Sequence, residues 1–319
     1  MNYMIFDNPL DKNVMEFISK SEYSIVTKYP EKKLSSVKEM WKYCKEILKM
    51  TKEDDTIIFW YDFLGILFWH LAKLKLKKRK VFVLNILLKN KKSLKNRFAK
   101  VLYKKALKGK DLKATVTSKD YGDYLNNFLH IKKNYYVLND PCHFTECKQN
   151  INDNNYVFCG GRNGRDWEFM TELAKEMPDY DFHFILGTSD AKDYQNSFSK
   201  NVQVRTEVSP SEFDEELMNA SLVAMPLNTE APAGLLAFYQ AAYYGKMIIT
   251  SNTVTTRGYF TNDSGVLCEK DIEEWKTKIM TFMENKSERD RIGFNFQKYI
   301  MENCSEKEYL DKLEAFAFN

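Results

Sequence analysis

Short apolar runs alternate along the chain with longer segments in which apolar residues recur every three or four positions. The runs predict β-strands, and the segments between them predict amphipathic helices. In the first half, strands are expected at 2–6, 24–27, 56–60, 81–84 and 114–118, and helices at 37–50, 63–74, 94–107 and 121–129. The alternation then starts again, with strands at 156–159, 182–186, 202–205, 222–226, 246–250 and 265–268 and helices at 167–177, 211–220, 234–244 and 272–284. This order predicts an α/β fold with parallel sheets and helices on both faces.

Residues 140–155 separate the two series. They have no apolar period and are rich in polar turn formers, so they are the best candidate for a linker. The chain has 319 residues, enough for two domains of about 150 residues each. We expect two Rossmann-like domains, at 1–148 and 149–319, that face each other across a cleft. Ligands in such sheets bind at the carboxyl ends of the strands.

Composition narrows the class of protein. Hydrophobic residues make up 44% and charged residues 29% of the chain, which is typical of a packed globular protein. No apolar run approaches the roughly 20 residues of a membrane-spanning helix, and the first residues do not read as a secretory signal. The six cysteines form no Cys-x-x-Cys pair and are expected to be reduced thiols in a cytoplasmic protein.

Charge is concentrated in one stretch. Residues 71–113 hold 17 Lys or Arg and a single acid, a local charge of +16, whereas the whole chain carries +4. Such a surface predicts a polyanionic partner, either anionic lipid or nucleic acid. The absence of zinc ligands, an aromatic RNA-binding motif or a basic zipper argues against nucleic acid.

Within this stretch, the helix expected at 94–107 has an apolar stripe bordered by cations. Leu94, Phe98, Val101 and Leu102 form the stripe, and Lys92, Lys95, Arg97, Lys100, Lys104 and Lys105 surround it. The pattern predicts a helix that lies in a membrane interface. The alternative is a surface helix that uses the stripe to pack on its own domain. We therefore expect residues 73–113 to meet an anionic membrane surface, with the protein peripheral on the inner face of the cell membrane.

A glycine-rich turn links the first strand of the second series to its helix. It reads Gly160-Gly161-Arg162-Asn-Gly-Arg165-Asp. Glycines allow a close approach of the backbone to a ligand, and a helix N-terminus favours an anion. Arg162 and Arg165 add charged donors suited to a diphosphate. A turn of this kind can also serve packing alone, and its spacing matches neither a dinucleotide fingerprint nor a P-loop.

A second motif runs from Met225 to Thr250. A strand ends at a proline, a loop with Glu230 follows, and a helix begins at Gly234 and leads through Gln240 to Gly245-Lys246. In order and spacing, this run and the Gly160 turn resemble the donor-binding segments of GT-B glycosyltransferases, especially family 4 (group 1). The resemblance covers roughly residues 156–284.

The resemblance implies roles for individual residues. Arg162 and Arg165 would bind the diphosphate of a nucleotide sugar beside Gly160 and Gly161, with the amides of Gly234 and Leu235 completing the cradle. The loop at 204–209, with Arg205, would contact the nucleobase. Gln240 stands where the family has the second glutamate of Glu-x7-Glu, which clamps the ribose, so the pattern is broken here. Glu230 would contact the transferred sugar, and the alternatives are a solvated loop acid for Glu230 and a helix-edge polar residue for Gln240.

The resemblance also bears on the chemistry. It implies a metal-independent enzyme with no cofactor, because arginines and helix amides would stabilise the leaving diphosphate. Family 4 members mostly retain the anomeric configuration without an enzymic base. If a base is needed, Asp7 is preferred over Asp62, and His70 is expected to be a core residue.

The expected function is therefore transfer of a sugar, from a UDP-sugar by preference, to a lipid-linked or cell-envelope glycan in polysaccharide biosynthesis. The enzymatic alternative is a sugar-nucleotide epimerase, for which the necessary acids and histidines cannot be assigned. The alternative from another class is a non-catalytic paralogue that partners an active transferase, which the loss of the second glutamate suggests.

Overall fold

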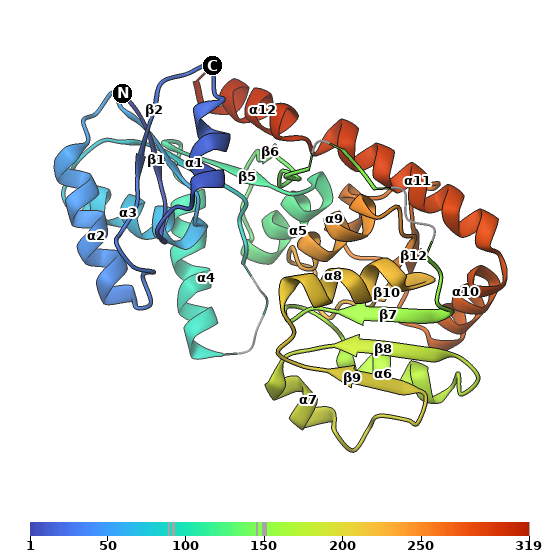
Figure 1. Ribbon diagram of the computed structural model, residues 1–319. Helices are drawn as coiled ribbons and strands as arrows, with labels where there is room; N and C mark the ends of the chain where they lie inside the picture. The colour runs from blue at the N-terminus through green and yellow to red at the C-terminus, as the bar shows by residue number, and fades with distance from the viewer. Residues whose placement is uncertain (89, 91–92, 145, 149–151, 319) are drawn as a thin grey trace. The chain divides into compact units, whose positions relative to one another are not determined.

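The computed structural model describes residues 1–88, 90, 93–144, 146–148 and 152–318. Lys92 of the predicted cationic border and residues 145 and 149–151 of the predicted linker lie outside the described residues. The chain divides into two compact units (Figure 1). Unit 1 comprises Met1–Asp140 and Glu306–Asn319, and unit 2 comprises Pro141–Ser305.

Unit 1 is a parallel six-stranded sheet with helices on both faces. The strand order is β2-β1-β3-β4-β5-β6. The strands are β1 (Asn2–Ile5), β2 (Ile25–Lys28), β3 (Thr56–Phe59), β4 (Lys80–Val83), β5 (Leu112–Val116) and β6 (Tyr136–Val137). The helices are α1 (Lys12–Ser19), α2 (Val37–Met50), α3 (Asp62–Leu74), α4 (Leu94–Leu107), α5 (Lys119–Leu129) and α12 (Glu306–Phe318).

The C-terminal helix belongs to this first unit, whereas the sequence pattern assigned residues 149–319 to the second domain. Tyr309, Leu310 and Leu313 of α12 are buried against the cluster that holds Met4 of β1 and Phe17 of α1. The physical reason is burial of apolar surface on a face of the first sheet. A hydrophobic pattern identifies such a helix but does not identify the sheet that covers its apolar side.

Unit 2 is a second parallel six-stranded sheet, in the order β12-β11-β10-β7-β8-β9. Its strands are β7 (Tyr156–Gly160), β8 (Asp181–Ile185), β9 (Val202–Arg205), β10 (Leu222–Met225), β11 (Ile248–Ser251) and β12 (Val266–Cys268). Its helices are α6 (Trp167–Lys175), α7 (Thr188–Tyr194), α8 (Pro210–Asn219), α9 (Leu235–Tyr243), α10 (Ile272–Glu284) and α11 (Lys286–Asn303), with a short 3-10 turn, η1, at Thr256–Gly258.

Two hydrophobic clusters cover the faces of this second sheet. One gathers side chains of α8, α9 and α11, and the other gathers side chains of α6 and α10. The predicted α/β architecture, with parallel sheets between helical layers, is confirmed. Helices α1, α7, α11 and α12 and the two-residue strand β6 were not expected from the sequence.

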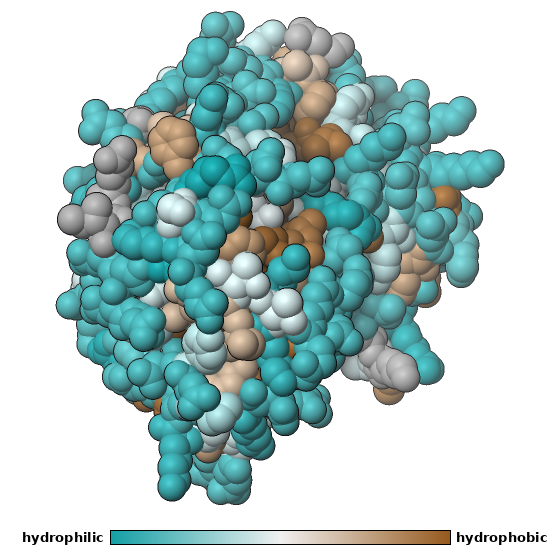
Figure 2. Space-filling view, turned by 90° about the vertical axis from the view of Figure 1, so that its right-hand side faces the viewer, coloured by the Kyte–Doolittle hydropathy of each residue, from teal (hydrophilic) through white to brown (hydrophobic). Residues whose placement is uncertain are grey.

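Figure 2 shows the face that carries α10 and α11, which is mostly hydrophilic with a hydrophobic patch near its centre. Within the part of the chain that the structure describes, no helix is both long enough and apolar enough to cross a membrane.

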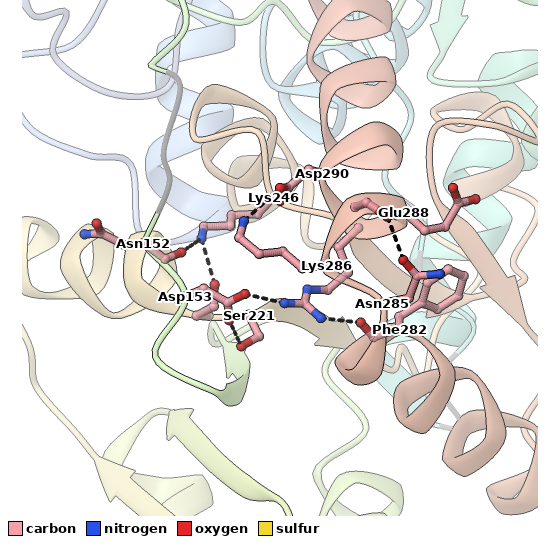
Figure 3. Close-up of polar contacts among 12 residues, drawn as sticks. Asn152, Asp153, Ser221, Lys246, Phe282, Asn285, Lys286, Glu288 and Asp290 are labelled. Atoms are coloured by element: carbon pink, nitrogen blue, oxygen red, sulfur yellow. Dashed lines mark hydrogen bonds and ion pairs between the residues drawn. The ribbon is translucent and has the colours of Figure 1, made fainter.

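Two buried cations fix the segment that enters β7 (Figure 3). The ammonium group of Lys246 donates to the carbonyl oxygens of Asn152 (2.6 Å) and Ala220 (2.7 Å), and burial lowers its pKa to about 8. The guanidinium of Arg289 on α11 pairs with the carboxylate of Asp153. The glycine-rich turn at the other end of β7 therefore follows a strand whose entry is fixed by buried polar contacts.

Candidate functional site

The site of interest in unit 2 lies where the strand order reverses. From β7 the chain proceeds outward through β8 to β9, then returns to β10 on the other side of β7 and proceeds to β12. The carboxyl ends of β7 and β10 are therefore adjacent while their connections diverge. Such a switch point is where open α/β sheets bind ligands.

The glycine-rich turn after β7 requires its glycines. Gly161 and Gly164 have φ values of +124° and +73°, which side chains with a Cβ rarely adopt. A Cβ on Gly160 would lie 2.6 Å from the ring of Phe213, and one on Gly164 would lie 2.6 Å from the Cβ of Ala233. The turn is therefore packed directly against the loop that precedes α9.

The turn is also joined to the segment after β10 by hydrogen bonds. The amide of Asn228 donates to the carbonyl of Gly164 (3.0 Å), and the amide of Asp166 donates to the carbonyl of Pro226 (2.9 Å). The side-chain amide of Asn228 donates to the carbonyl of Arg165 (3.0 Å). Two motifs that are some 60 residues apart in sequence thus form one structure, and sequence reasoning missed Asn228 because nothing in the local pattern marks it.

Arg165 supplies a buried positive charge where the turn and the segment after β10 meet. It is only 5% exposed, and its Nε and Nη1 donate to the carbonyl oxygens of Gly160 (2.8 Å) and Asn163 (3.2 Å). Among the described residues no carboxylate pairs with it, and burial lowers the pKa of its guanidinium. A buried cation without a counterion is costly, so this one is suited to an incoming anion.

The N-terminus of α9 lies beside this guanidinium. Its N-cap residue, Gly234, has φ +81° and makes no side-chain capping bond, and the first turn of the helix has no acid. A Cβ on Gly234 would lie 2.9 Å from Nη1 of Arg165, and one on Gly161 would lie 2.6 Å from Nη2. The guanidinium therefore lies between the two glycines. The uncapped amides after Gly234, which include that of buried Leu235, add to the positive potential that attracts an anion.

A cavity of about 350 Å³ adjoins the switch point at the carboxyl ends of β10, β11 and β12. Its size lies within the range of small-molecule sites, roughly 300–1,000 Å³. Glu230 lines it, and its carboxylate accepts from the amide of Val254 (2.9 Å). Asp166 and Lys270 also line it and form an ion pair of 2.6 Å. The cavity is thus a polar one, with carboxylates and hydroxyl groups on its wall.

Gln240 lies on α9 and contacts α8. Its Nε2 donates to Oδ1 of Asp214 at 2.9 Å, and burial raises the pKa of that carboxyl. Gln240 stands where the resembled family has its second glutamate, and the structure places the Asp214 carboxylate directly beside its side-chain amide. Sequence reasoning missed Asp214 as a partner of Gln240, because α8 and α9 are brought together only by the fold.

The other two predicted arginines have different surroundings. Arg162 is exposed, and its side-chain stem lies beside Gly187 at the start of α7. Arg205 lies at the end of β9, two strands from β7, where it pairs with Glu212 (2.6 Å) and Glu216 (2.8 Å). The structure therefore brings Gly160, Gly161, Arg165, Gly234 and Leu235 together, whereas both terminal nitrogens of the Arg205 guanidinium are already paired with carboxylates.

Unit 1 has a switch point of its own, between β1 and β3. Asp7 follows β1 there, is 9% exposed, and has its pKa raised by burial. Asp62 begins α3 after β3, and its carboxylate accepts from the amide of Leu87 and the hydroxyl of Tyr103, each at 2.7 Å. His70 is half-buried between α3 and α4, where Nε2 lies 3.0 Å from the carbonyl oxygen of Leu102. Of the three, Asp7 is the carboxylate that follows β1 at this switch point.

No group of three or more His, Cys, Asp or Glu side chains that could hold a metal ion is found among the described residues.

Comparison with known proteins bears on the identity of this site. Residues 143–299, which are most of unit 2 and include both motifs, match the family described as "Glycosyl transferases group 1". Among curated protein sequences none matches the chain.

Solved structures resemble the whole chain at low identity. Sucrose-phosphate synthase from Thermosynechococcus elongatus has a TM-score of 0.77 at 11% identity, with 99% of this chain and 98% of that one covered. Anabaena HepE in complex with UDP-glucose has a TM-score of 0.74 at 11% identity, with 99% of both chains covered. S. aureus TarM has a TM-score of 0.66 at 13% identity; 88% of this chain is covered, but it spans only 58% of TarM. At these identities the likeness establishes the fold.

Proposed function

We propose that this chain, whose residues 143–299 match the group 1 glycosyltransferases and whose fold resembles that of GT-B enzymes, transfers a sugar from a UDP-sugar to a lipid-linked or cell-envelope glycan. Unit 2 binds the donor at the switch point between β7 and β10, and unit 1 binds the acceptor. The enzyme works in the cytoplasm, peripheral to the inner face of the cell membrane.

One observation carries the donor assignment: Arg165 is a buried guanidinium that no carboxylate of the described residues pairs with, beside the uncapped start of α9. When the glycosidic bond to the donor breaks, negative charge grows on the leaving diphosphate. Donors that are already oriented and shielded from water stabilise such charge most effectively. Arg165 and the amides of Leu235 and its neighbours then supply this stabilisation, and Arg162 adds a second charge from the exposed side.

Separate observations support the nature of the donor and the course of the reaction. HepE, a structural neighbour, has been crystallised with UDP and glucose, which favours uridine as the base. The polar cavity beside Glu230 is suited to the hydroxyl groups of the transferred sugar. The family resemblance supports retention of the anomeric configuration and a reaction without a metal ion. If a base deprotonates the acceptor, Asp7 supplies it, because burial raises the pKa of its carboxyl.

The contact between Gln240 and Asp214 bears on the alternative, a non-catalytic partner of an active transferase. If the chain had lost donor binding, Asp214 would have no role beside Gln240, the residue at the position of the family's second glutamate. An amide held by Asp214 presents its carbonyl oxygen to a ribose hydroxyl. We therefore favour a working donor site with an altered ribose contact.

A donor panel tests the proposal. UDP-, GDP- and dTDP-sugars are incubated with the wild-type protein and with the Arg165→Met variant, and release of the nucleoside diphosphate is followed over time. We expect slow hydrolysis of a UDP-sugar by the wild type and at least a hundredfold less by the variant, on the scale of losing one charged donor at a developing anion. Hydrolysis of no donor, together with no binding of any nucleotide, would support the non-catalytic partner instead.

A further inference from the structure

Helix α4 is attached to unit 1 by one face only. Tyr103, Ala106 and Leu107 are buried on that face, and the hydroxyl of Tyr103 donates to the buried carboxylate of Asp62 (2.7 Å). The carbonyl of Leu102 bonds the ring of His70 on α3. Helix α4 thus lies beside α3 in unit 1 (Figure 1).

The predicted apolar stripe lies mainly on the opposite face and is uncovered. Leu94 is 82% exposed, Phe98 65% and Val101 49%. They follow one another at helical spacing, so they form a continuous apolar strip along the first two turns. The alternative that this stripe packs on its own domain is therefore not what the structure has. Three large apolar side chains in a row at one exposed site indicate an interaction surface.

The charge on α4 has a single sign. The helix carries five cations, Lys95, Arg97, Lys100, Lys104 and Lys105, and no acid. In the described part of the chain no carboxylate pairs with any of them, and Lys100 instead lies over the ring of Phe128, 3.7 Å from its centre. The nearest acid along the chain, Asp111, is engaged by Lys73 (2.8 Å) and Trp69. The positive charge beside the apolar strip is thus not neutralised by unit 1.

We propose that α4 docks on an anionic lipid bilayer, with Leu94, Phe98 and Val101 among the acyl chains near the headgroups and with the flanking Lys and Arg side chains on the lipid phosphates. An apolar strip with cationic borders and no acid matches the two layers of such an interface, apolar below and negatively charged above. A nucleic acid would use the cations but leave the strip in water. The proposal stands on the exposed face of α4 and does not depend on the donor site.

Co-sedimentation with vesicles tests this. The probes are vesicles of equal parts phosphatidylcholine and phosphatidylglycerol, and vesicles of phosphatidylcholine alone. We expect the wild type to bind the mixed vesicles and to be released as salt rises, because the lipid charge contributes to binding. Phe98→Ser should weaken this binding roughly tenfold without a change in charge, since a buried phenyl group is lost from the interface.

Matched controls separate local from general effects. Phe294→Ser removes a phenylalanine of similar exposure (54%) from α11 in unit 2, and should leave vesicle binding unchanged. Lys95→Glu, Arg97→Glu and Lys105→Glu together should abolish binding, at roughly fivefold per cation removed. The triple change Lys192→Glu, Lys200→Glu and Lys298→Glu alters the net charge by the same amount on unit 2 and should have a much smaller effect. All variants should hydrolyse donor at the wild-type rate, which shows that they are folded.

Three results would overturn the proposal: wild-type protein that does not sediment with the mixed vesicles at low salt, Phe98→Ser that binds as tightly as the wild type, or equal losses in the two triple variants. Tight binding of RNA by wild-type protein that ignores vesicles would assign the cations to nucleic acid instead. None of these results bears on donor hydrolysis, so the proposed function is tested separately.

Discussion

The Nε atom of Arg165 donates a 2.8 Å hydrogen bond to the carbonyl oxygen of Gly160, the last residue of β7. This bond turns the side chain back over its own turn, so that the guanidinium lies between Gly161 and Gly234 rather than in solvent. The free protein thus bears the cost of a buried charge that no carboxylate in the described part of the chain offsets. An anion at this position would offset that cost, so binding and stability are linked here.

Replacement of Gly234 by alanine should damage both properties. The new Cβ would lie 2.9 Å from Nη1 of Arg165, and the residue would keep a φ of +81°. We expect the free energy of unfolding to fall by about 1–3 kcal/mol, and UDP binding to weaken because the guanidinium is displaced. Urea denaturation and calorimetry measure the two effects. Gly187→Ala is the control, since its nearest neighbour would be 3.5 Å away and its φ is negative; equal behaviour of the two variants would contradict the cradle.

Substitution of Gln240 by glutamate should not restore the family's ribose contact by itself. The new carboxylate would lie against Asp214, whose oxygen now accepts a 2.9 Å bond from the amide, and like charges at that distance oppose ionisation. We expect Gln240→Glu to lower the free energy of unfolding by about 1 kcal/mol and to leave UDP affinity no better.

The double variant Gln240→Glu, Asp214→Asn keeps a bonded pair and frees a carboxylate for the ribose. It should bind UDP more tightly than the wild type by about 1 kcal/mol, because charge-assisted bonds are stronger. A 2′,3′-dideoxy analogue should bind all variants equally. Identical UDP curves for all of them would remove Gln240 from the ribose site.

Titration of the Asp62 carboxyl should change the free energy of unfolding with pH. Burial raises the pKa of its carboxyl to about 6, against its hydrogen bonds from Leu87, Tyr103 and Phe63, which lower it. Between the unfolded value near 4 and the folded value near 6, the folded protein binds more protons than the unfolded chain. This group's contribution to stability is therefore full below about pH 4 and falls, by about 3 kcal/mol in total, as the pH rises through 6.

Asp62→Asn lacks this titration. Its free energy of unfolding, relative to the wild type, should improve steadily from pH 4 to pH 7, and urea denaturation at several pH values measures the difference. The other carboxyls, including the buried Asp140, are common to both proteins and cancel. A difference that is constant over this range would show that Asp62 has an ordinary pKa.

The local pattern of apolar and polar residues predicted most of the helices and strands, and it predicted the glycine-rich turn of the site. The apolar runs at 156–159 and 222–226 predicted β7 and β10, and the glycine-rich run predicted the turn after β7. The positive φ values of Gly161 and Gly164 are a finding of the structure. Periodicity is a property of single elements, so it predicted helices without showing which sheet covers them. Helix α12 itself was not expected from the sequence, so its packing on unit 1 was not predicted either.

The local sequence pattern also could not predict which residues distant in sequence contact the site residues. Arg162 and Arg165 look alike in sequence, yet one is exposed and the other buried, because only the second is turned back by the carbonyl of Gly160. Arg205 was expected near the nucleobase, and its ion pairs with Glu212 and Glu216 depend on the position of α8 beside β9. The contact of Gln240 with Asp214 likewise needs two helices that meet only in the fold.

The central claim is that the buried guanidinium of Arg165 exists to bind a diphosphate, and titration calorimetry with UDP and with uridine tests it most directly. For Arg165→Met we expect UDP affinity to fall by about 2–3 kcal/mol, the scale of one charged hydrogen-bonding group, while uridine binds as it does to the wild type. The free energy of unfolding should change by less than about 1 kcal/mol, because the lost hydrogen bonds are offset by relief of a buried charge. If Arg165→Met binds UDP as tightly as the wild type does, the diphosphate lies elsewhere and the assignment is contradicted.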